Sequence, residues 1–255
     1  MSSRGYDPIA LAEATRKLVE RGIERKYYRF RGGRWYGGIA TADCVGCNLR
    51  CVFCWSGVPR DRPAEVGRFY SPEYVYGRLD RIALRRGYRL LRVSGNEPTI
   101  ARRHLLRLLE LVEEDGKYTF ILETNGILIG HDKSYAKELA RFDRVHVRVS
   151  LKGASPEEFT RLTGARPEAF DLQLKALKNL LDAGVRCHPA VMLSFSSKEN
   201  VKRLIRRLEE IDPILVEEFE EEYVFLYPHV VERLRRAGLS PRIAYRPNRI
   251  PEELI

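Results

Sequence analysis

The feature that most constrains the fold is an alternation of helix and strand patterns from about Ile39 to Arg235, with a spacing of about 30 residues. This spacing is typical of repeated βα units, in which helices cover a parallel sheet. Helix starts with capping or proline residues are predicted at Ser71, Ala101, Asp132, Ser155, Arg166, Ser197 and Pro228. Strands are predicted at 89–93, 118–123, 144–151, 185–193 and 214–219, with one more directly before the cysteines that begin at position 44. We therefore expect an α/β fold with six βα units.

The residues ahead of this alternation predict an extension. A helix is expected to begin at Asp7 and to end at Gly22. Aromatic-rich stretches at 26–31 and 34–41 flank Gly32-Gly33, which predicts a β-hairpin. We expect an N-terminal helix and hairpin over 1–38, one continuous barrel over 39–238 and a C-terminal tail over 239–255.

The stretch 145–151 carries the clearest strand pattern. Over 145–152, apolar residues alternate with four polar ones: His146, Arg148, Ser150 and Lys152. Helices cover the outer face of a βα barrel, so this polar set is predicted to face the lumen, and the same parity adds Glu123, Asn125, Arg186, His188 and Met192. Six units are fewer than the eight of a closed TIM barrel, so we predict a partial (βα)6 TIM-like barrel that is laterally open. Buried charges there must be paired or must meet a polar ligand.

Composition narrows the class of protein. The chain of 255 residues is 44% apolar and 31% charged, which excludes a disordered chain. No apolar run is long enough to cross a membrane and the first residues do not resemble a signal peptide, so we expect a cytoplasmic protein with no membrane partner. The net charge of +10 allows nucleic-acid or acidic partners, and the low counts of Gln and Met favour a thermophilic source.

Four of the five cysteines lie within eleven positions: Cys44, Cys47, Cys51 and Cys54. The last three have the spacing C-x3-C-x2-C, a loop short enough to bind one [4Fe-4S] cluster and to leave its fourth iron open. A structural zinc site is the alternative, although such sites usually pair two separated C-x2-C motifs. Cys44 is either a structural residue or a fourth ligand that closes the cluster. Cys187 is predicted to be a small core residue.

The cysteine segment resembles the signature of the radical S-adenosylmethionine (SAM) superfamily, in which this motif follows the first strand of a partial barrel. Phe53 before the last cysteine also resembles that pattern. A segment after the second strand is similar to the family's GGEP segment, which meets the amino group of SAM, with Asn96 in place of a glycine: Gly95, Asn96, Glu97 and Pro98. The resemblance implies that Cys47, Cys51 and Cys54 bind the cluster. It also implies that SAM chelates the open iron and that reduction yields a 5'-deoxyadenosyl radical that abstracts hydrogen from a substrate.

Within the superfamily, two segments are similar to those of glycyl-radical-enzyme activating enzymes, such as the pyruvate formate-lyase activase. LETNG at 122–126 is similar to their DTNG, and VSLKG at 149–153 is similar to their DLK. The resemblance implies that SAM's carboxylate or ribose meets residues of these segments: Glu123, Asn125, Ser150 and Lys152. Arg148 and His188 complete the predicted SAM pocket, and an ion pair from Arg148 to Glu123 is the alternative. No catalytic side chain is assigned.

Three further features stay open. His229 is either similar to a histidine of the activases or a surface residue, and Trp55 is expected to shield the cluster. The acidic run 217–222 is either a solvated face or a part of the barrel mouth.

Three functions follow from these patterns. The first is a radical SAM enzyme similar to the activases, which acts on a protein glycine or another large substrate. The second is an RNA-modifying radical SAM enzyme, because the chain is basic and CVFCW is similar to the tRNA wybutosine-synthesis enzymes. The third is a non-enzyme, either an iron–sulfur electron carrier or a zinc-binding module. An enzyme would also need a one-electron donor such as ferredoxin or flavodoxin.

Overall fold

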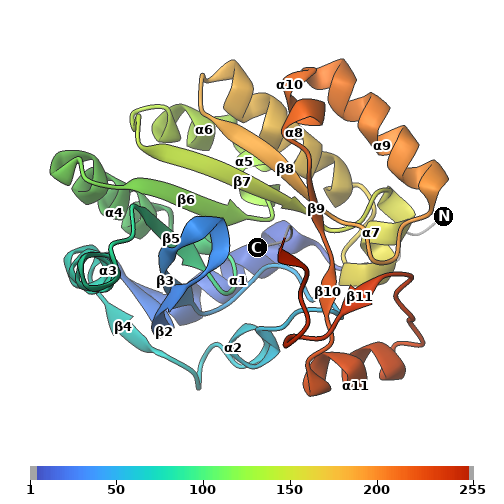
Figure 1. The fold of residues 1–255 in the computed structure, drawn as a ribbon, viewed down its shortest axis with the longest axis horizontal. Coiled ribbons are helices and arrows are strands. Elements are labelled where there is room, and N and C mark those ends of the chain that lie inside the picture. The colour runs from blue at the N-terminus through green and yellow to red at the C-terminus, as the bar shows by residue number, and fades with distance from the viewer. Residues whose placement is uncertain (1–4, 253–255) are drawn as a thin grey trace.

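A computed structural model describes residues 5–252, whose centre is one open sheet with helices on its outer side (Figure 1). Along the sheet the strands follow the order β1-β2-β3-β5-β6-β7-β8-β9, and β4 pairs with β2. Six neighbours in this order are parallel: β3 (Ile39–Cys44), β5 (Leu90–Ser94), β6 (Thr119–Thr124), β7 (Val145–Leu151), β8 (Cys187–Met192) and β9 (Glu220–Glu222). Strand β2 (Glu24–Gly33) is antiparallel to β3. It also pairs in antiparallel fashion with β1 (Glu20–Arg21) and β4 (Arg68–Tyr70). The prediction of a partial, open α/β barrel is confirmed.

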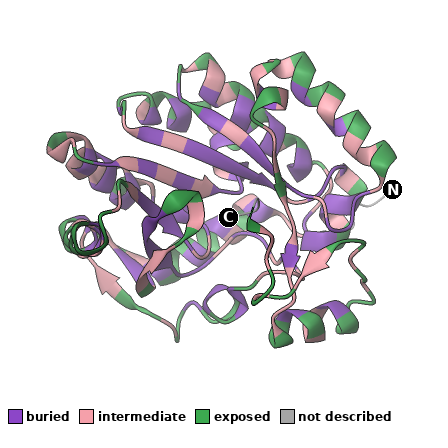
Figure 2. Ribbon diagram, viewed as in Figure 1, coloured by how far each residue is buried: buried purple, intermediate pink, exposed green. Residues whose placement is uncertain are grey.

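The described helices are α1 (Pro8–Val19), α2 (Gly57–Asp61), α3 (Pro72–Arg86), α4 (Arg102–Asp115), α5 (Ile127–His131), α6 (Lys133–Leu139), α7 (Pro156–Thr163), α8 (Ala169–Asp182), α9 (Lys198–Ile211), α10 (Ile214–Glu217) and α11 (Pro228–Arg236). Five of the eleven described helices begin at a side-chain N-cap: α1, α3, α6, α7 and α9. Side chains of Asp7, Ser71 and Ser155 accept backbone N–H groups of the first turns of α1, α3 and α7, as expected of N-caps. The outer sides of these helices are exposed and the strands they cover are buried (Figure 2). None of the described helices is long and apolar enough to cross a membrane.

The predicted alternation along β7 is present in the structure. Val145, Val147, Val149 and Leu151 are buried in the main apolar core between the sheet and the helices. His146 and Arg148 instead contact side chains of neighbouring strands on the opposite face, which is the lumen of the partial barrel. Cys187 lies in the apolar core, as predicted.

Two N-terminal turns differ from prediction. Helix α1 ends at Val19, and Gly22 forms the turn between β1 and β2 rather than a helix end. Gly32-Gly33 does not form the hairpin turn, because both glycines belong to β2 and pair with β3, and residues 34–38 turn the chain. A Cβ at Gly32 would lie 2.8 Å from the flexible side chain of Arg86, which would have to move to accommodate it.

The C-terminal part also differs from prediction. Residues 214–217 form α10 rather than a strand, because Asp212 accepts a hydrogen bond from the N–H of Ile214 and starts a helical turn. The strand follows at β9. Part of the predicted tail forms β11 (Ala244–Tyr245), which pairs with β10 (Val224–Phe225). Trp35, after β2, stacks on Phe225 with ring centroids 5.9 Å apart, so this segment bridges the two edges of the open sheet (Figure 1).

Candidate cofactor site at the carboxyl end of the sheet

The cysteine loop follows β3 and lies at the carboxyl end of the parallel strands. Gly46 fixes its start, since its N–H donates to the Asn96 side chain at 2.9 Å and its carbonyl accepts the N–H of Glu97 at 3.1 Å. A Cβ at Gly46 would lie 2.6 Å from Thr15 of α1, and the φ of 86° also favours glycine. The loop is thus packed between the N-terminal helix and the end of β5.

Three thiols of this loop come from Cys47, Cys51 and Cys54, and all are free. The N–H of Leu49 lies 3.4 Å from the sulfur of Cys47, and the side-chain amide of Asn125 lies 3.9 Å from it. Burial raises the pKa of Cys51 to about 11 and that of Cys47 further. Without a cation these thiols are therefore neutral, and a bound cationic centre would reverse the shift because it stabilises the thiolate that ligates a metal.

The residues fit a [4Fe-4S] cluster better than a single metal ion. Sulfurs that share one zinc lie within roughly 4 Å of each other, whereas a cluster binds each cysteine at a different iron. Within residues 5–252, no three His, Cys, Asp or Glu side chains are close enough together to hold one ion. The side-chain nitrogen of Asn48, beside Cys47, is buried with no hydrogen-bond partner among the described residues. An unpaired buried donor beside three spaced thiols is consistent with a larger group at this position.

Cys44 lies apart from these three thiols. It is the last residue of β3, fully buried, and belongs to the apolar core with Ala40 and Ala42. The alternate residues of β3, Thr41 and Asp43, contact arginines instead. The parity of β3 therefore directs Cys44 toward the helices.

Guanidinium groups hold the backbone of the cysteine loop. Arg60 of α2 donates to the carbonyl of Cys51. Arg233 of α11 donates to the carbonyl of Val52 at 3.1 Å and to that of Cys54. Sequence reasoning missed both arginines, because nothing near them in the chain marks this contact. His229, also of α11, lies with its Nε2 2.8 Å from the carbonyl of Trp55, so this helix contacts the cysteine loop at a second point.

The GGEP resemblance implies that this segment meets the amino group of SAM, but the Glu97 side chain is already bound within the protein. Its carboxylate is 1% exposed and accepts hydrogen bonds from Thr99, from the Thr124 hydroxyl at 2.7 Å and from the Asn125 N–H at 2.8 Å. The side chain therefore ties the end of β5 to the end of β6. The Gly95 carbonyl accepts the side-chain amide of Asn96 at 2.8 Å, and Gly95 has a φ of 96° with Asp43 directly behind it.

The lumen holds a network of opposite charges. Glu123 accepts hydrogen bonds from Arg92 at 2.7 Å and from Ser94 at 2.5 Å. Burial acts to raise the pKa of Glu123, but Arg92 and Arg148 outweigh it and the net shift is downward. These contacts place Glu123 just below the carboxyl ends of the strands.

Arg148 does not form the predicted alternative ion pair with Glu123. It pairs with Glu220 at 2.5 Å and with Glu222 at 2.8 Å, both on β9. The acidic run was expected to form either a solvated face or part of the barrel mouth, and two of its members enter the lumen. Burial opposes ionisation of Glu220, yet His188 and Arg148 lower its pKa to about 2. The period-two pattern of strand β9 was the available signal, which the predicted strand boundary at 214–219 obscured.

The remaining predicted pocket residues separate into two levels. Ser150 donates to Glu222 at 2.5 Å, and the ammonium of Lys152 lies against the Ser150 hydroxyl, at the carboxyl end of β7. His188 pairs in register with Arg148, nearer the amino end, and contacts His146 at 2.6 Å and Glu220 at 3.0 Å. An opening of about 390 Å³ lies there, lined in part by His146 and His188. His188 is therefore part of the lumen floor rather than of the edge with the cysteine loop.

Comparison with known proteins identifies the family. A model of the radical SAM superfamily matches residues 43–208. A protein of Methanosarcina acetivorans named "Probable GTP 3',8-cyclase" is 30% identical over 156 residues, which is 60% of this chain and 44% of that protein. A namesake of Methanopyrus kandleri is 28% identical over 179 residues, which is 70% of this chain and 54% of that protein. The chain spans about half the length of the curated relatives it matches.

Two solved structures share the fold. Streptococcus suis SuiB bound to S-adenosylmethionine has a TM-score of 0.58 at 24% identity and covers 76% of this chain and 44% of its own. A spore photoproduct lyase mutant with bound SAM and dinucleoside spore photoproduct has a TM-score of 0.61 at 12% identity, over 95% and 73% of the two chains. At these identities the likeness concerns the fold alone. The family match, which spans more than half of the chain and includes the three-thiol loop, shows that this protein belongs to the radical SAM superfamily of enzymes, which use a [4Fe-4S] cluster and SAM.

Proposed function

We propose that this chain binds the cluster through Cys47, Cys51 and Cys54 and positions SAM at the carboxyl edge of the barrel for reductive cleavage. The observation that carries this proposal is the convergence at one edge of the cysteine loop with the ends of β5, β6 and β7. Asn125 links these parts, since its amide donates to Asn48 at 2.7 Å and its N–H donates to Glu97.

When bound, the cluster supplies the electron that splits the sulfonium of SAM into methionine and a 5'-deoxyadenosyl radical. The chain's own residues bind SAM and orient it. Backbone groups at Gly95 and Asn96 accept the amino group of SAM, and Lys152 attracts its carboxylate. The ion pair between Arg92 and Glu123 and the pairs of Arg148 close the lumen beneath, which keeps bulk water from the reacting end.

For the substrate, the first candidate is a glycine of a partner protein. The similarity of LETNG and VSLKG to activating enzymes supports it. Glu123, Asn125, Ser150 and Lys152 of these segments lie on adjacent strands, β6 and β7, or directly after them, as two segments that bind one ligand should.

RNA is the second candidate, and a specific observation favours it. Four arginines of α3 (Arg78, Arg81, Arg85 and Arg86) line one groove and make no ion pair with any residue in 5–252. Free guanidinium groups in a row are suited to phosphates. This chain matches part of relatives named for an activity on GTP, so GTP is a third compound to test.

Anaerobically reconstituted protein reduced with dithionite should convert SAM to 5'-deoxyadenosine, and SAM should alter the EPR spectrum of the reduced cluster. Cys51→Ala should lose both, whereas Cys187→Ala, a core cysteine, should keep both. Retained SAM cleavage in Cys51→Ala would contradict the ligand assignment. Each candidate substrate would be labelled with deuterium: a protein at its glycines, an RNA, or GTP. The one that transfers deuterium to 5'-deoxyadenosine would identify the substrate class.

A further inference from the structure

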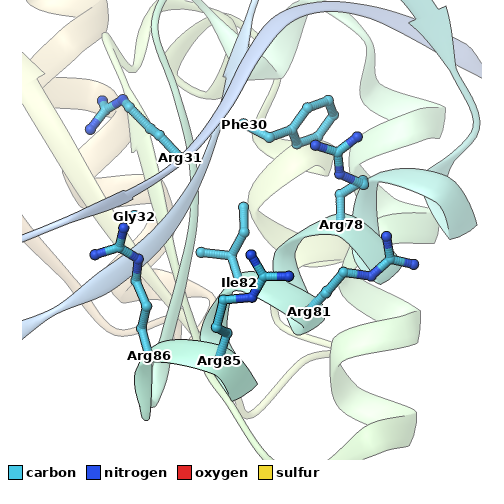
Figure 3. A pocket seen from close by; sticks show the side chains of 8 residues that line it. All are labelled: Phe30, Arg31, Gly32, Arg78, Arg81, Ile82, Arg85 and Arg86. Carbon is cyan, nitrogen blue, oxygen red and sulfur yellow. The ribbon is translucent and has the colours of Figure 1, made fainter.

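A basic groove of about 410 Å³ runs between β2 and α3 on the outer side of the barrel (Figure 3). We call it the arginine groove and define it by Phe30 and Gly32 of β2 with Arg78, Arg81, Ile82, Arg85 and Arg86 of α3. Arg31 also lines it, but its side chain points to the other side of β2, where it binds Asp43 at 2.8 Å (Figure 3). The groove therefore carries four guanidinium groups and no carboxylate.

These four guanidinium groups lack anionic partners among the described residues. The acidic residues of α3 are turned elsewhere: Glu73 pairs with Arg107 at 3.2 Å, and Asp80 accepts the Tyr118 hydroxyl at 2.7 Å. On α9, by comparison, Arg207 pairs with Asp171, while Arg203 and Arg206 have no ion pair with the described residues. What distinguishes the groove is that its four guanidinium groups line one cavity with no carboxylate among the residues that line it.

The helix dipole explains only part of this concentration. Arg85 and Arg86 lie in the last turn of α3, where cations are favourable whether or not a ligand is present. Arg78 and Arg81 lie one to two turns earlier, where this effect has faded. Arg78, Arg81 and Arg85 share one helix face and span about 10 Å, which is enough for more than one phosphate.

Aromatic side chains form one end of the groove. Arg78 lies over the ring of Phe30 at 5.0 Å, and Phe30 contacts the edge of Tyr70 at 5.5 Å. Tyr70 stacks on Tyr74 with ring centroids 4.7 Å apart, and Tyr74 is 44% exposed. An exposed ring beside guanidinium groups is the combination that binds single-stranded nucleic acid, because bases stack on rings while arginines meet phosphates.

Strand β2 lines the groove at one end and pairs with β3 just before the cysteine loop at the other. Phe30 of the groove is followed back along the strand by Tyr27, which pairs with Cys44, three residues before the first cluster cysteine. The carbonyl of Lys26 also accepts a hydrogen bond from the N–H of Val45, the residue directly after β3. A strand of nucleic acid along the groove would therefore run beside the element that leads to the cysteine loop.

We propose that the arginine groove binds the phosphate backbone of single-stranded nucleic acid, with a base stacked on Tyr74. The proposal rests on the RNA candidate under the proposed function and places part of the substrate outside the barrel. The fork of arginine matches phosphate oxygens in pairs, and the flat ring distinguishes this surface from one that only attracts acidic side chains.

The test is fluorescence anisotropy with a labelled 20-nucleotide RNA of mixed sequence, a DNA of the same sequence and a poly-glutamate peptide. The groove variant is Arg78→Gln with Arg81→Gln and Arg85→Gln. The matched control, Arg203→Gln with Arg206→Gln and Arg207→Gln on α9, removes the same charge from another exposed helix face. The groove variant should bind RNA about tenfold more weakly at low salt, and its salt slope should fall by about 2, because each single-strand phosphate contact contributes roughly 0.7. Tyr74→Ala should weaken binding, whereas Tyr74→Phe, which keeps the ring but loses the hydrogen bond from Arg78 to the Tyr74 hydroxyl, should bind like the wild type.

Equal losses in the groove variant and the α9 control would overturn the proposal, since binding would then follow net charge alone. Poly-glutamate binding as tight as RNA and equally sensitive to the groove variant would also overturn it, in favour of an acidic protein partner. The RNA and DNA arms distinguish the two sources of the same phosphate chemistry. Formation of 5'-deoxyadenosine without substrate should be unchanged in the groove variant, so failure of the groove is separable from failure of the radical chemistry.

Discussion

At the scale of single residues, Lys152 is the side chain best placed to receive an anion at the carboxyl edge. Its ammonium lies 3.8 Å from Glu222 and next to the Ser150 hydroxyl, and the side chain is 18% exposed. Its charge also opposes the rise that burial causes in the pKa of Cys51, so it lies near the cysteine loop. One lysine therefore connects the lumen network to the site.

Lys152→Met should weaken SAM binding by about 10- to 100-fold, because a charged hydrogen bond of about 1.5 to 3 kcal/mol is lost. Iron content should stay at the wild-type level, since the lysine is not a cluster ligand. Isothermal titration of the reconstituted protein with SAM measures the effect, and Lys198→Met on the surface of α9 is the control. An unchanged SAM affinity in Lys152→Met would remove this residue from the pocket.

At the scale of elements, α11 acts as a clamp on the cysteine loop. Arg233 and His229 reach loop carbonyls from a helix more than 170 positions away in the chain. The helix is anchored by Val230 and Leu234, which pack in an apolar cluster with Met192 and Phe195. The clamp brings a cation close to the expected position of the cluster, where a positive charge favours the reduced state.

Arg233→Gln should shift the reduction potential of the cluster to more negative values, on the order of tens of millivolts. Arg235→Gln removes the same charge from the same helix, but Arg235 is exposed and pairs with Glu232. It should leave the potential within a few millivolts of wild type. An EPR-monitored redox titration compares the two, and equal shifts would show that net charge, not the clamp, sets the potential.

At the scale of the whole molecule, buried histidines couple stability to pH. His104 is 1% exposed, and its Nδ1 bonds the Ile23 carbonyl at 2.8 Å while Nε2 lies 2.9 Å from the Tyr27 hydroxyl. Burial lowers its pKa to about 4; the Ile23 carbonyl, Glu73 and Glu24 oppose this shift and Arg25 adds to it. His104 therefore stays neutral in the folded protein at pH values where the same side chain is protonated in the unfolded chain, whose pKa is near 6.5.

The free energy of unfolding should thus fall as pH decreases from about 6.5 to about 4, by up to about 3 kcal/mol from His104 alone. Glu220, with a pKa of about 2, adds to the loss only below about pH 4.5. His104→Asn, whose amide can still donate to Ile23, should be less stable at pH 7 but lose less between pH 7 and 5. Thermal unfolding at both pH values measures this, and parallel losses in the two proteins would contradict it.

Local patterns were enough to predict much of this protein. Alternation along 145–151 predicted both faces of β7, and cap residues such as Ser71 and Ser155 predicted helix starts. They succeed because a strand's parity and a helix's first turn depend on neighbours within a few residues. The strand placed at 214–219 failed for the same local reason, since the hydrogen bond from the Ile214 N–H to Asp212 favours a turn over the apolar run.

The sequence by itself determined the βα architecture and the three-thiol loop, and the family match agrees with both. Only the tertiary structure decided that Arg148 pairs with Glu220 and Glu222 rather than Glu123, and that Arg233 holds the loop. An arginine can bind any carboxylate or carbonyl in the protein. Which one it binds depends on which lies close to it in the folded structure. That proximity comes from packing between segments tens to hundreds of residues apart, which no local pattern encodes.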